Sequence, residues 1–325
     1  MRSCVCLLLS VALVCSFAGN AESGDVAAPG LTVEGRVAFT EGPAWDKATS
    51  NVYFSDIDNN RILRRDPTGA FHTYRQPSGR ANGLAFDSQG RLIACEGNRE
   101  GGNRRVTRTE ADGRITVLTD SFGGKAYNSP NDLIIDSADR IYFTDPRYGD
   151  RRDMQIVDEA GKPIEGVYRI DSDGTVRSIL THEIDRPNGI ALSHDEKTLY
   201  VAENNNDSSN TPRRLWKFTL REDGTVEPGT GTVLFDWKEG RGPDGMTVGP
   251  DGNLYVAAGT NFASSSETSQ HPAGIYVIDP ASGELLNLLA VPEDMITNCT
   301  FGGPDGRTLY ITAGHKLWSL AIPAN

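Results

Sequence analysis

Short apolar strands alternate with polar turns along most of the chain, and the alternation is organised into six similar units. Each unit begins with an Asn, Asp or Glu, usually followed by Gly, and continues as an apolar strand, a polar turn and a second apolar strand. The leading residues, which recur at intervals of about 41 to 57 residues, are Glu41, Asn82, Asn131, Asn188, Asp244 and Asn298. A supersecondary unit that repeats at a fixed period is typical of propellers and solenoids.

Turn residues separate the strands within each unit. The turns at 249–252 and 303–306 combine Gly, Pro and Asp, whose backbone preferences suit tight turns. A second hairpin follows in most units, for example at 61–74 around the turn 66–69. Two hairpins make a four-stranded blade, and a ring of such blades protects the edges of its sheets.

The sixth unit is one strand short, since the segment 316–322 alone follows its first hairpin. The segment 31–38 precedes the first unit and belongs to none, so we expect it to supply the missing strand. No apolar pattern of helical period and useful length occurs. The sequence therefore predicts an all-β fold, a six-bladed β-propeller with four-stranded blades whose ring is closed by an N-terminal strand.

The N-terminal segment resembles a secretory signal peptide, because a basic residue is followed by the apolar run 5–17 and then by small residues. We expect residues 1–21 to be removed and 22–325 to form one propeller domain, exported to the periplasm or out of the cell. The apolar run is shorter than the roughly 20 residues that a membrane span needs. Nothing later in the sequence resembles a membrane segment.

The chain is acidic, with a net charge of −12 at pH 7. Such a surface has little with which to neutralise phosphates, so the composition argues against nucleic acid and anionic membranes as partners. Cys95 and Cys299 are the cysteines outside the predicted signal peptide. They lie in the second and sixth units, which are not neighbours in a ring, so we predict two free, buried thiols.

Hairpin geometry places the leading residues at one face of the ring. A hairpin returns the chain to the end at which it started, so each second strand ends beside its leading residue. Three irregular stretches, 147–165, 204–213 and 260–273, start at those ends. We therefore expect them to surround the mouth of the central channel and to shape a pocket there.

Two carboxylates, Glu41 and Asp244, and four amides would meet at this mouth. Carboxylate and amide oxygens without histidine favour a hard cation, Ca²⁺ before Mg²⁺ or Mn²⁺, since zinc prefers nitrogen and sulfur. The alternative is that the Asn-Gly and Asp-Gly pairs only make turns. Glu is not a favoured turn residue, and all six residues occur in phase, so the pattern favours a cation site.

Acids also end the second strand of four units, and these are Asp56, Glu96, Asp145 and Glu203. Acids at strand ends often accept hydrogen bonds from loop amides, which gives most of them a structural role. We single out Asp145 as a substrate contact because the longest irregular stretch follows it. His271 is a further candidate for acid–base chemistry, beside the alternative of a solvated loop histidine. Serine-hydrolase, metalloprotease and P-loop motifs do not occur.

Several motifs, taken in order, resemble those of one family. They are Glu41-Gly42-Pro43, Pro130-Asn131-Asp132, Pro187-Asn188-Gly189 and Pro243-Asp244-Gly245-Met246. Together they resemble the gluconolactonase/regucalcin (senescence marker protein) family, and more closely its bacterial-type gluconolactonases, over about residues 31–322. The resemblance implies a six-bladed propeller with one catalytic divalent cation, usually Ca²⁺, that hydrolyses a sugar lactone to the aldonic acid.

The resemblance also assigns roles to individual residues. Glu41, Asn188 and Asp244 would bind the cation, and Asn131 would lie near both cation and substrate as a further ligand. In the family the Asp of the Pro-Asp-Gly motif is also proposed as general base, which makes Asp244 the catalytic residue. The cation would polarise the lactone carbonyl, while Asp244 or a hydroxide on the cation would provide the base.

The substrate is a small sugar lactone in this interpretation, with Asn82, Asn131 and Asp145 as its contacts. The animal regucalcin type carries an Arg where this chain has Ser129, so the sugar is left open. Two alternatives also stay open: a non-catalytic, metal-stabilised ligand-binding propeller, and a paraoxonase-like lactonase or esterase for apolar substrates. Polar residues such as Tyr148 in the irregular stretches favour a sugar. Mg²⁺, Mn²⁺ and Zn²⁺ stay open as alternatives to Ca²⁺.

Overall fold

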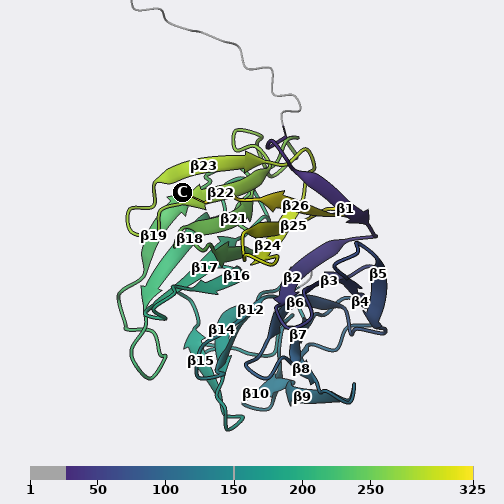
Figure 1. The fold of residues 1–325 in the computed structure, drawn as a ribbon. Coiled ribbons are helices and arrows are strands. Elements are labelled where there is room, and N and C mark those ends of the chain that lie inside the picture. The colour runs from purple at the N-terminus through teal and green to yellow at the C-terminus, as the bar shows by residue number, and fades with distance from the viewer. Residues whose placement is uncertain (1–26, 149–150, 325) are drawn as a thin grey trace, which may run out of the picture.

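The computed structural model describes residues 27–148 and 151–324, which form four-stranded antiparallel sheets and no helix (Figure 1). The first blade contains β2 (Thr40–Asp46), β3 (Asn51–Asp56), β4 (Arg61–Arg65) and β5 (Phe71–Arg75). The second contains β6 (Ala81–Phe86), β7 (Leu92–Glu96), β8 (Arg105–Thr109) and β9 (Ile115–Thr119). The third contains β12 (Leu133–Ile135), β13 (Ile141–Asp145), β14 (Gly166–Ile170) and β15 (Val176–Leu180).

Three further blades complete the ring. The fourth contains β16 (Pro187–Leu192), β17 (Thr198–Asn204), β18 (Arg213–Thr219) and β19 (Thr232–Asp236). The fifth contains β20 (Met246–Val248), β21 (Leu254–Ala258), β22 (Gly274–Ile278) and β23 (Leu285–Ala290). The sixth contains β24 (Ile296–Gly302), β25 (Thr308–Ala313), β26 (Lys316–Ala321) and β1 (Thr32–Arg36). A small hairpin, β10 (Ser121–Phe122) and β11 (Lys125–Ala126), links the second and third blades.

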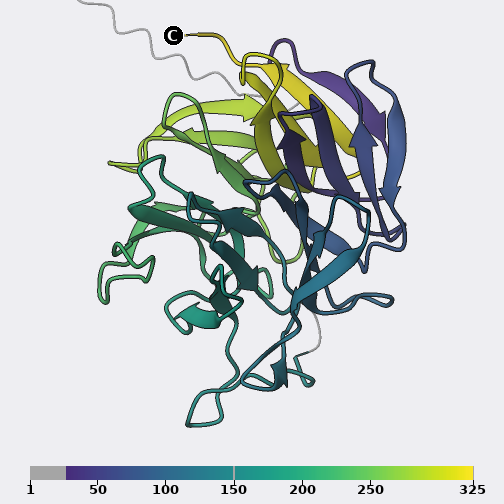
Figure 2. The ribbon, with the colours of Figure 1, turned by 60° about the horizontal axis from the view of Figure 1, so that its bottom comes forward.

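The N-terminal strand closes the ring. β1 pairs antiparallel with β26, so that Thr32 lies opposite Ser319 and Arg36 opposite Lys316, and Figure 2 shows purple β1 beside the yellow C-terminal strands. The first strands of neighbouring blades contact one another around the channel, from β2 through β6, β12, β16 and β20 to β24 and back to β2. The predicted six-bladed propeller and its closing strand are confirmed.

The core lies between the faces of neighbouring blades. β7, β13 and β21 are buried along their whole length, whereas the outermost strand β5 is mostly exposed. A strand covered on both faces needs a continuous apolar run, which is what the second strand of each unit carries. Between the fifth and sixth blades, for example, Tyr255 and Ile275 pack in one cluster with Leu309 and Trp318. Burial of an aliphatic side chain such as Ile275 or Leu309 contributes about 1.5–3 kcal/mol.

Two sequence predictions concern single features. Cys95 and Cys299 are buried, free thiols, as expected. The predicted signal peptide, 1–21, lies outside the described residues. Within the described part of the chain, no helix has the length and apolar character that crossing a membrane requires.

Candidate active site

Several leading residues lie at irregularities in the first strand of a blade and not in turns, whereas Asn131 and Asp244 lie two residues before β12 and β20 begin. The pairing of β2 with β3 shifts register between Glu41 and Ala44, and the pairing of β6 with β7 shifts between Ala81 and Leu84. The pairing of β16 with β17 also shifts register, between Pro187 and Ile190, on either side of Asn188. A β-bulge redirects side chains and is frequent next to functional sites. The turn interpretation therefore does not hold for these units.

The Gly after a leading residue lets neighbouring blades approach closely. The N–H of Gly189 donates to the carbonyl oxygen of Asp244 at 2.9 Å, and a Cβ on Gly189 would lie 2.3 Å from that oxygen. Gly42 has a φ of +49°, and a Cβ there would lie 2.1 Å from the carbonyl oxygen of Asn82. The recurring dipeptide thus reflects contact between blades, which brings successive leading residues together around the channel.

Five of the six leading residues line one cavity of about 310 Å³. They are Glu41, Asn82, Asn131, Asn188 and Asp244. Side chains from the irregular stretches complete the wall, among them Tyr148, Asn204 and Asn206. Arg241, which the sequence analysis did not single out, also lines it. The predicted ligands are therefore gathered in one place, together with a cation from the protein itself.

Asn298, the sixth leading residue, lies outside this cavity. Its Nδ2 donates to Oδ2 of Asp132 at 3.1 Å, and the two residues line another cavity of about 250 Å³, whose wall comes from residues further along the first strands. Burial raises the pKa of Asp132 to about 7. His271 is also absent from the lining of the candidate site; its ring lies 6.3 Å from that of Phe235. Neither residue contributes to the site.

The two carboxylates of the site are buried and electrostatically unfavourable as a pair. Burial raises the pKa of Glu41 well above its usual range, and the charges of Asp244 and Asp132 raise it further. Burial also raises the pKa of Asp244 to about 6, against the lowering effect of Arg241. Ionised together, Glu41 and Asp244 carry more negative charge than one guanidinium balances, which favours an additional cation.

Arg241 contacts the predicted base directly. Its Nη2 donates to Oδ2 of Asp244 at 3.0 Å, and 7% of its side chain is exposed. The residue lies three positions before Asp244, in the segment that connects β19 to β20. This proximity to Asp244 in the sequence was the one signal that could have identified Arg241 as a site residue. It was not sufficient, because the direction of the side chain depends on the segments packed around it.

Tyr148 holds the amide of Asn188. Nδ2 of Asn188 donates to the Tyr148 hydroxyl at 2.7 Å, and the buried guanidinium of Arg186 lies 4.8 Å from the centre of the Tyr148 ring. Arg186 in turn donates to Oδ1 of Asn206 at 2.8 Å and to Oδ2 of Asp207 at 2.9 Å. Burial raises the pKa of Tyr148, so its hydroxyl stays protonated. With Nδ2 engaged, the amide oxygen of Asn188 is the atom available to a cation.

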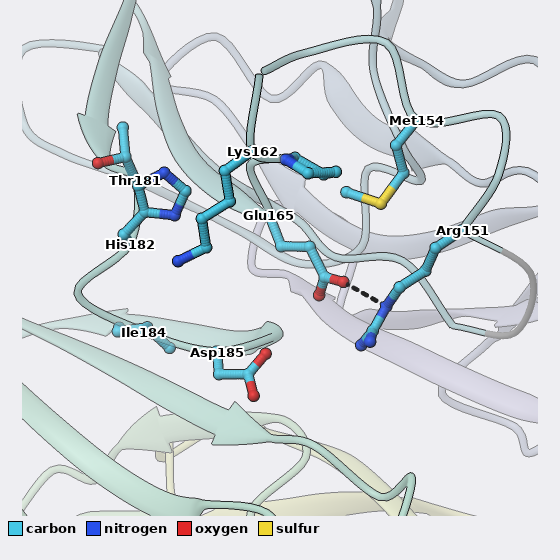
Figure 3. A pocket seen from close by; sticks show the side chains of 9 residues that line it. Arg151, Met154, Lys162, Glu165, Thr181, His182, Ile184 and Asp185 are labelled. Atoms are coloured by element: carbon cyan, nitrogen blue, oxygen red, sulfur yellow. Dashed lines mark ion pairs between the residues drawn. The ribbon is translucent and has the colours of Figure 1, made fainter. Parts of the chain in front are cut away.

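A separate cavity of about 280 Å³ is lined by residues of the irregular stretch after β13 and of the connection between β15 and β16 (Figure 3). Arg151 and Lys162 extend towards it, and Nε of Arg151 lies 2.9 Å from Oε1 of Glu165. Oε2 of Glu165 lies 3.8 Å from Nε of Arg186, whose guanidinium covers Tyr148. These ion pairs tie the irregular stretch after β13 to the fourth blade and so support the position of Tyr148.

Asp145 lies outside the candidate site, contrary to the expectation of a substrate contact. Its carboxylate is buried, with Oδ2 accepting from the backbone N–H of Asn128 at 2.8 Å and Oδ1 from that of Ser129 at 2.7 Å. Asp56 and Glu203 likewise accept from backbone amides. Asp56, Asp145 and Glu203 therefore hold the segment that enters their own blade, which is the structural role considered for them above. Glu96 accepts instead from side chains, among them those of Arg75 and Asn103.

The donors around the cavity suit a hard divalent cation. Glu41 and Asp244 supply carboxylates, and Oδ1 of Asn82 is buried without a hydrogen bond from any described residue. The cavity lining contains neither His nor Cys. In the described ranges no group of three or more His, Cys, Asp or Glu has the geometry of a metal site. A set of two carboxylates completed by amides is consistent with both findings and with the oxygen ligands of Ca²⁺.

Comparisons with known proteins extend over the whole propeller. The model of the SMP-30/Gluconolactonase/LRE-like region matches residues 39–315, which include all six leading residues. A gluconolactonase of Zymomonas mobilis is 31% identical over 319 residues, covering 90% of this chain and 81% of that protein. The pentonolactonase XacC of Haloferax volcanii is 28% identical, covering 84% of this chain and 80% of that protein.

A solved structure gives the same result. XC5397 from Xanthomonas campestris, described as a gluconolactonase, superposes with a TM-score of 0.73 at 31% identity, covering 90% of this chain and 89% of that one. The matched segment contains the bulged leading residues as well as the blades. The chain therefore belongs to the SMP-30/gluconolactonase/LRE-like family.

Proposed function

We propose that this protein is a divalent-cation-dependent lactonase that hydrolyses a sugar lactone to the corresponding aldonic acid. The observation that carries the proposal is the meeting of Glu41, Asn188 and Asp244 in one cavity at the channel mouth, with two buried carboxylates among them. The similarity to a gluconolactonase and a pentonolactonase supports a cyclic sugar ester as the substrate class.

Glu41, Asn188 and Asp244 would hold the cation, with Asn131 as a further oxygen ligand. We assign Ca²⁺ before Mg²⁺, Mn²⁺ or Zn²⁺, because these donors are carboxylate and amide oxygens. A cation bound there supplies a Lewis acid for the lactone carbonyl and balances the developing oxyanion.

Asp244 is the proton acceptor in this proposal. In this structure Oδ2 of its carboxylate accepts a hydrogen bond from Arg241. The carboxylate accepts a proton from the attacking water, whose oxygen bonds to the carbonyl carbon. The ring carbon–oxygen bond then breaks, and the proton is passed to the leaving alkoxide, which becomes a hydroxyl of the open-chain acid.

The walls of the cavity favour a hydroxylated substrate. The amides of Asn82, Asn131, Asn204 and Asn206 line it and can both donate and accept hydrogen bonds. Phe39 adds an apolar surface for one face of a sugar ring. A purely apolar ester bound in this cavity would leave these amides without hydrogen-bond partners, which lowers its affinity.

The test is acid release from glucono-1,5-lactone and a pentonolactone, followed in a pH-stat with Ca²⁺ and with chelator. We expect hydrolysis above the spontaneous rate with Ca²⁺ and none above it with chelator. Stabilisation by these lactones without turnover would instead support a binding propeller. Turnover of apolar lactones alone would support a paraoxonase-like enzyme.

We further propose that the protein is exported and that residues 1–21 are removed. The support is the sequence pattern described above. N-terminal sequencing of the protein recovered from the periplasm or medium of a bacterial expression host tests this. An intact N-terminus in the cytoplasmic fraction would contradict it.

A further inference from the structure

Arg241 lies between two carboxylates, those of Asp244 and Glu267, and donates a hydrogen bond to the first. Its Nη2 donates to Asp244 at 3.0 Å, whereas its Nη1 lies 3.7 Å from Oε1 of Glu267, beyond hydrogen-bonding distance. The Glu267 side chain is 12% exposed, and its Oε1 is buried and accepts no hydrogen bond from any described residue. Arg241 therefore has a second acidic partner within reach.

The backbone around this second partner is held firmly. Glu267 belongs to the irregular stretch 260–273, in which the N–H of Thr268 donates to the carbonyl oxygen of Glu239 at 2.7 Å. The fully buried guanidinium of Arg213 donates to the same oxygen at 3.1 Å and to that of Ser266 at 2.7 Å. These bonds hold the segment that carries Glu267 against the segment that leads to Arg241.

We propose that Arg241 shifts from Asp244 to Glu267 when a divalent cation binds, so that Glu267 sets the affinity of the site for the cation. The inference rests on the proposed cation site. A cation and a guanidinium that share the Asp244 carboxylate compete for its oxygens and repel each other in a buried setting. Glu267 gives the displaced guanidinium a carboxylate and removes the cost of leaving it buried without one. Arg241 and Glu267 are positioning residues in this scheme.

The arrangement predicts opposite effects for its two members. Calorimetric titration of the chelator-treated protein with Ca²⁺ measures the dissociation constant without reference to activity. Glu267→Gln should weaken Ca²⁺ binding about tenfold, because the guanidinium loses its second position, and Arg241→Gln should strengthen it about tenfold. The double variant should bind like Arg241→Gln, because Glu267 acts through Arg241.

Arg99→Gln is the matched control. Arg99 also lines the cavity, but it pairs with Asp58 at 2.6 Å and its side chain is 57% exposed. Its removal should leave the Ca²⁺ affinity within about twofold of the wild type. Thermal unfolding in chelator establishes that each variant is folded. Glu267→Gln alters charge at constant size and remains informative if Arg241→Gln does not fold.

The outcomes separate the inference from the proposed function. Ca²⁺ affinity of Glu267→Gln equal to or above that of the wild type would overturn the shift of Arg241. The shift would also be overturned if Glu267→Gln weakened Ca²⁺ binding as much in the Arg241→Gln background as in the wild type. That result would show that Glu267 attracts the cation directly and does not act through Arg241. A wild type that binds no divalent cation would overturn both the proposed cation site and this inference.

Discussion

Two sets of polar residues lie near the same face of the propeller, and they differ in their hydrogen-bond partners. Both oxygens of Asp145 accept backbone N–H groups, whereas Asp244 accepts a hydrogen bond from the side chain of Arg241. Burial raises the pKa of Asp145 to about 7 and that of Asp244 to about 6, so the pKa does not separate the two sets. The comparison of these two acids teaches that burial and pKa do not identify an acid available for chemistry: Asp244 lines the cavity, whereas Asp145 lies outside it with both oxygens bonded to backbone amides.

The strongest test of this comparison is Asp244→Asn. The variant keeps an oxygen ligand of similar shape but cannot accept a proton, so we expect activity to fall by about 10²-fold or more at saturating Ca²⁺. Initial rates measured across a Ca²⁺ titration check this. Glu41→Gln is the control, because it weakens cation binding and leaves the base in place, so excess Ca²⁺ should restore much of its activity. Full restoration of Asp244→Asn would show that Asp244 is a ligand only.

Asp145→Ala tests whether Asp145 supports the fold. Removing this carboxylate leaves the backbone N–H groups of Asn128 and Ser129 buried without acceptors, which should lower the free energy of unfolding by about 2–4 kcal/mol. Urea unfolding in the presence of chelator measures the change. Glu41→Gln, which removes an unfavourable buried charge, should be at least as stable as the wild type under the same conditions. A larger decrease in the free energy of unfolding for Glu41→Gln than for Asp145→Ala would show that Glu41, and not Asp145, is the acid that supports the fold.

The pH dependence of stability gives a third test. The pKa values of Asp132 and Asp244 are raised in the folded state, to about 7 and about 6, above an unfolded value of about 4. The folded state therefore holds more protons than the unfolded state. The contribution of these two groups to the free energy of unfolding, in the absence of a cation, should be greatest below about pH 4 and should be lost as the pH rises through about 7. Ca²⁺ should oppose this loss, by about 2.7 kcal/mol at a hundredfold excess over Kd.

Thermal unfolding from about pH 5 to about pH 8, with chelator and with Ca²⁺, measures both effects. The stabilisation by Ca²⁺ should increase with pH, because its carboxylate ligands must lose their protons first. Identical profiles with chelator and with Ca²⁺ would contradict the cation site.

The smallest expected effect belongs to Tyr148→Phe. The change removes the hydroxyl that accepts from Asn188 and keeps the ring under Arg186. We expect Ca²⁺ affinity to decrease about fivefold, the value of one hydrogen bond of about 1 kcal/mol, with stability in chelator nearly unchanged. Calorimetric titration measures it. Unaltered affinity would show that the tyrosine does not orient the amide.

The fold could be predicted from the sequence because its signals are local and repeated six times. The alternation of strands and turns identified the blades, and the unassigned segment before Glu41 identified the closing strand. The hairpin β10–β11 was not predicted, because it consists of two very short strands in a connection that no other unit shares.

The site could be predicted only in part. Glu41, Asn82 and Asn188 are placed by backbone bulges, which recur in their blades. Side-chain partners do not recur. Asn298 has a different neighbour from the other leading residues because Asp132, unlike the Gly that follows most of them, presents a carboxylate across the channel. The direction of Arg241 depends on Glu267 and Asp244 together, and no repeat describes that contact.

The pairing of β1 with β26 also determines when the sixth blade can complete its sheet. Thr32 finds its partner Ser319 only after nearly the entire chain has been made, so the first strand to emerge waits for the last. Five blades can form their sheets from neighbouring segments, but the sixth needs both ends of the chain at once. Such long-range pairing is slow, and until it occurs an unpaired edge is exposed to other chains. Completion of the sixth blade therefore depends on strand pairing across nearly the full length of the chain.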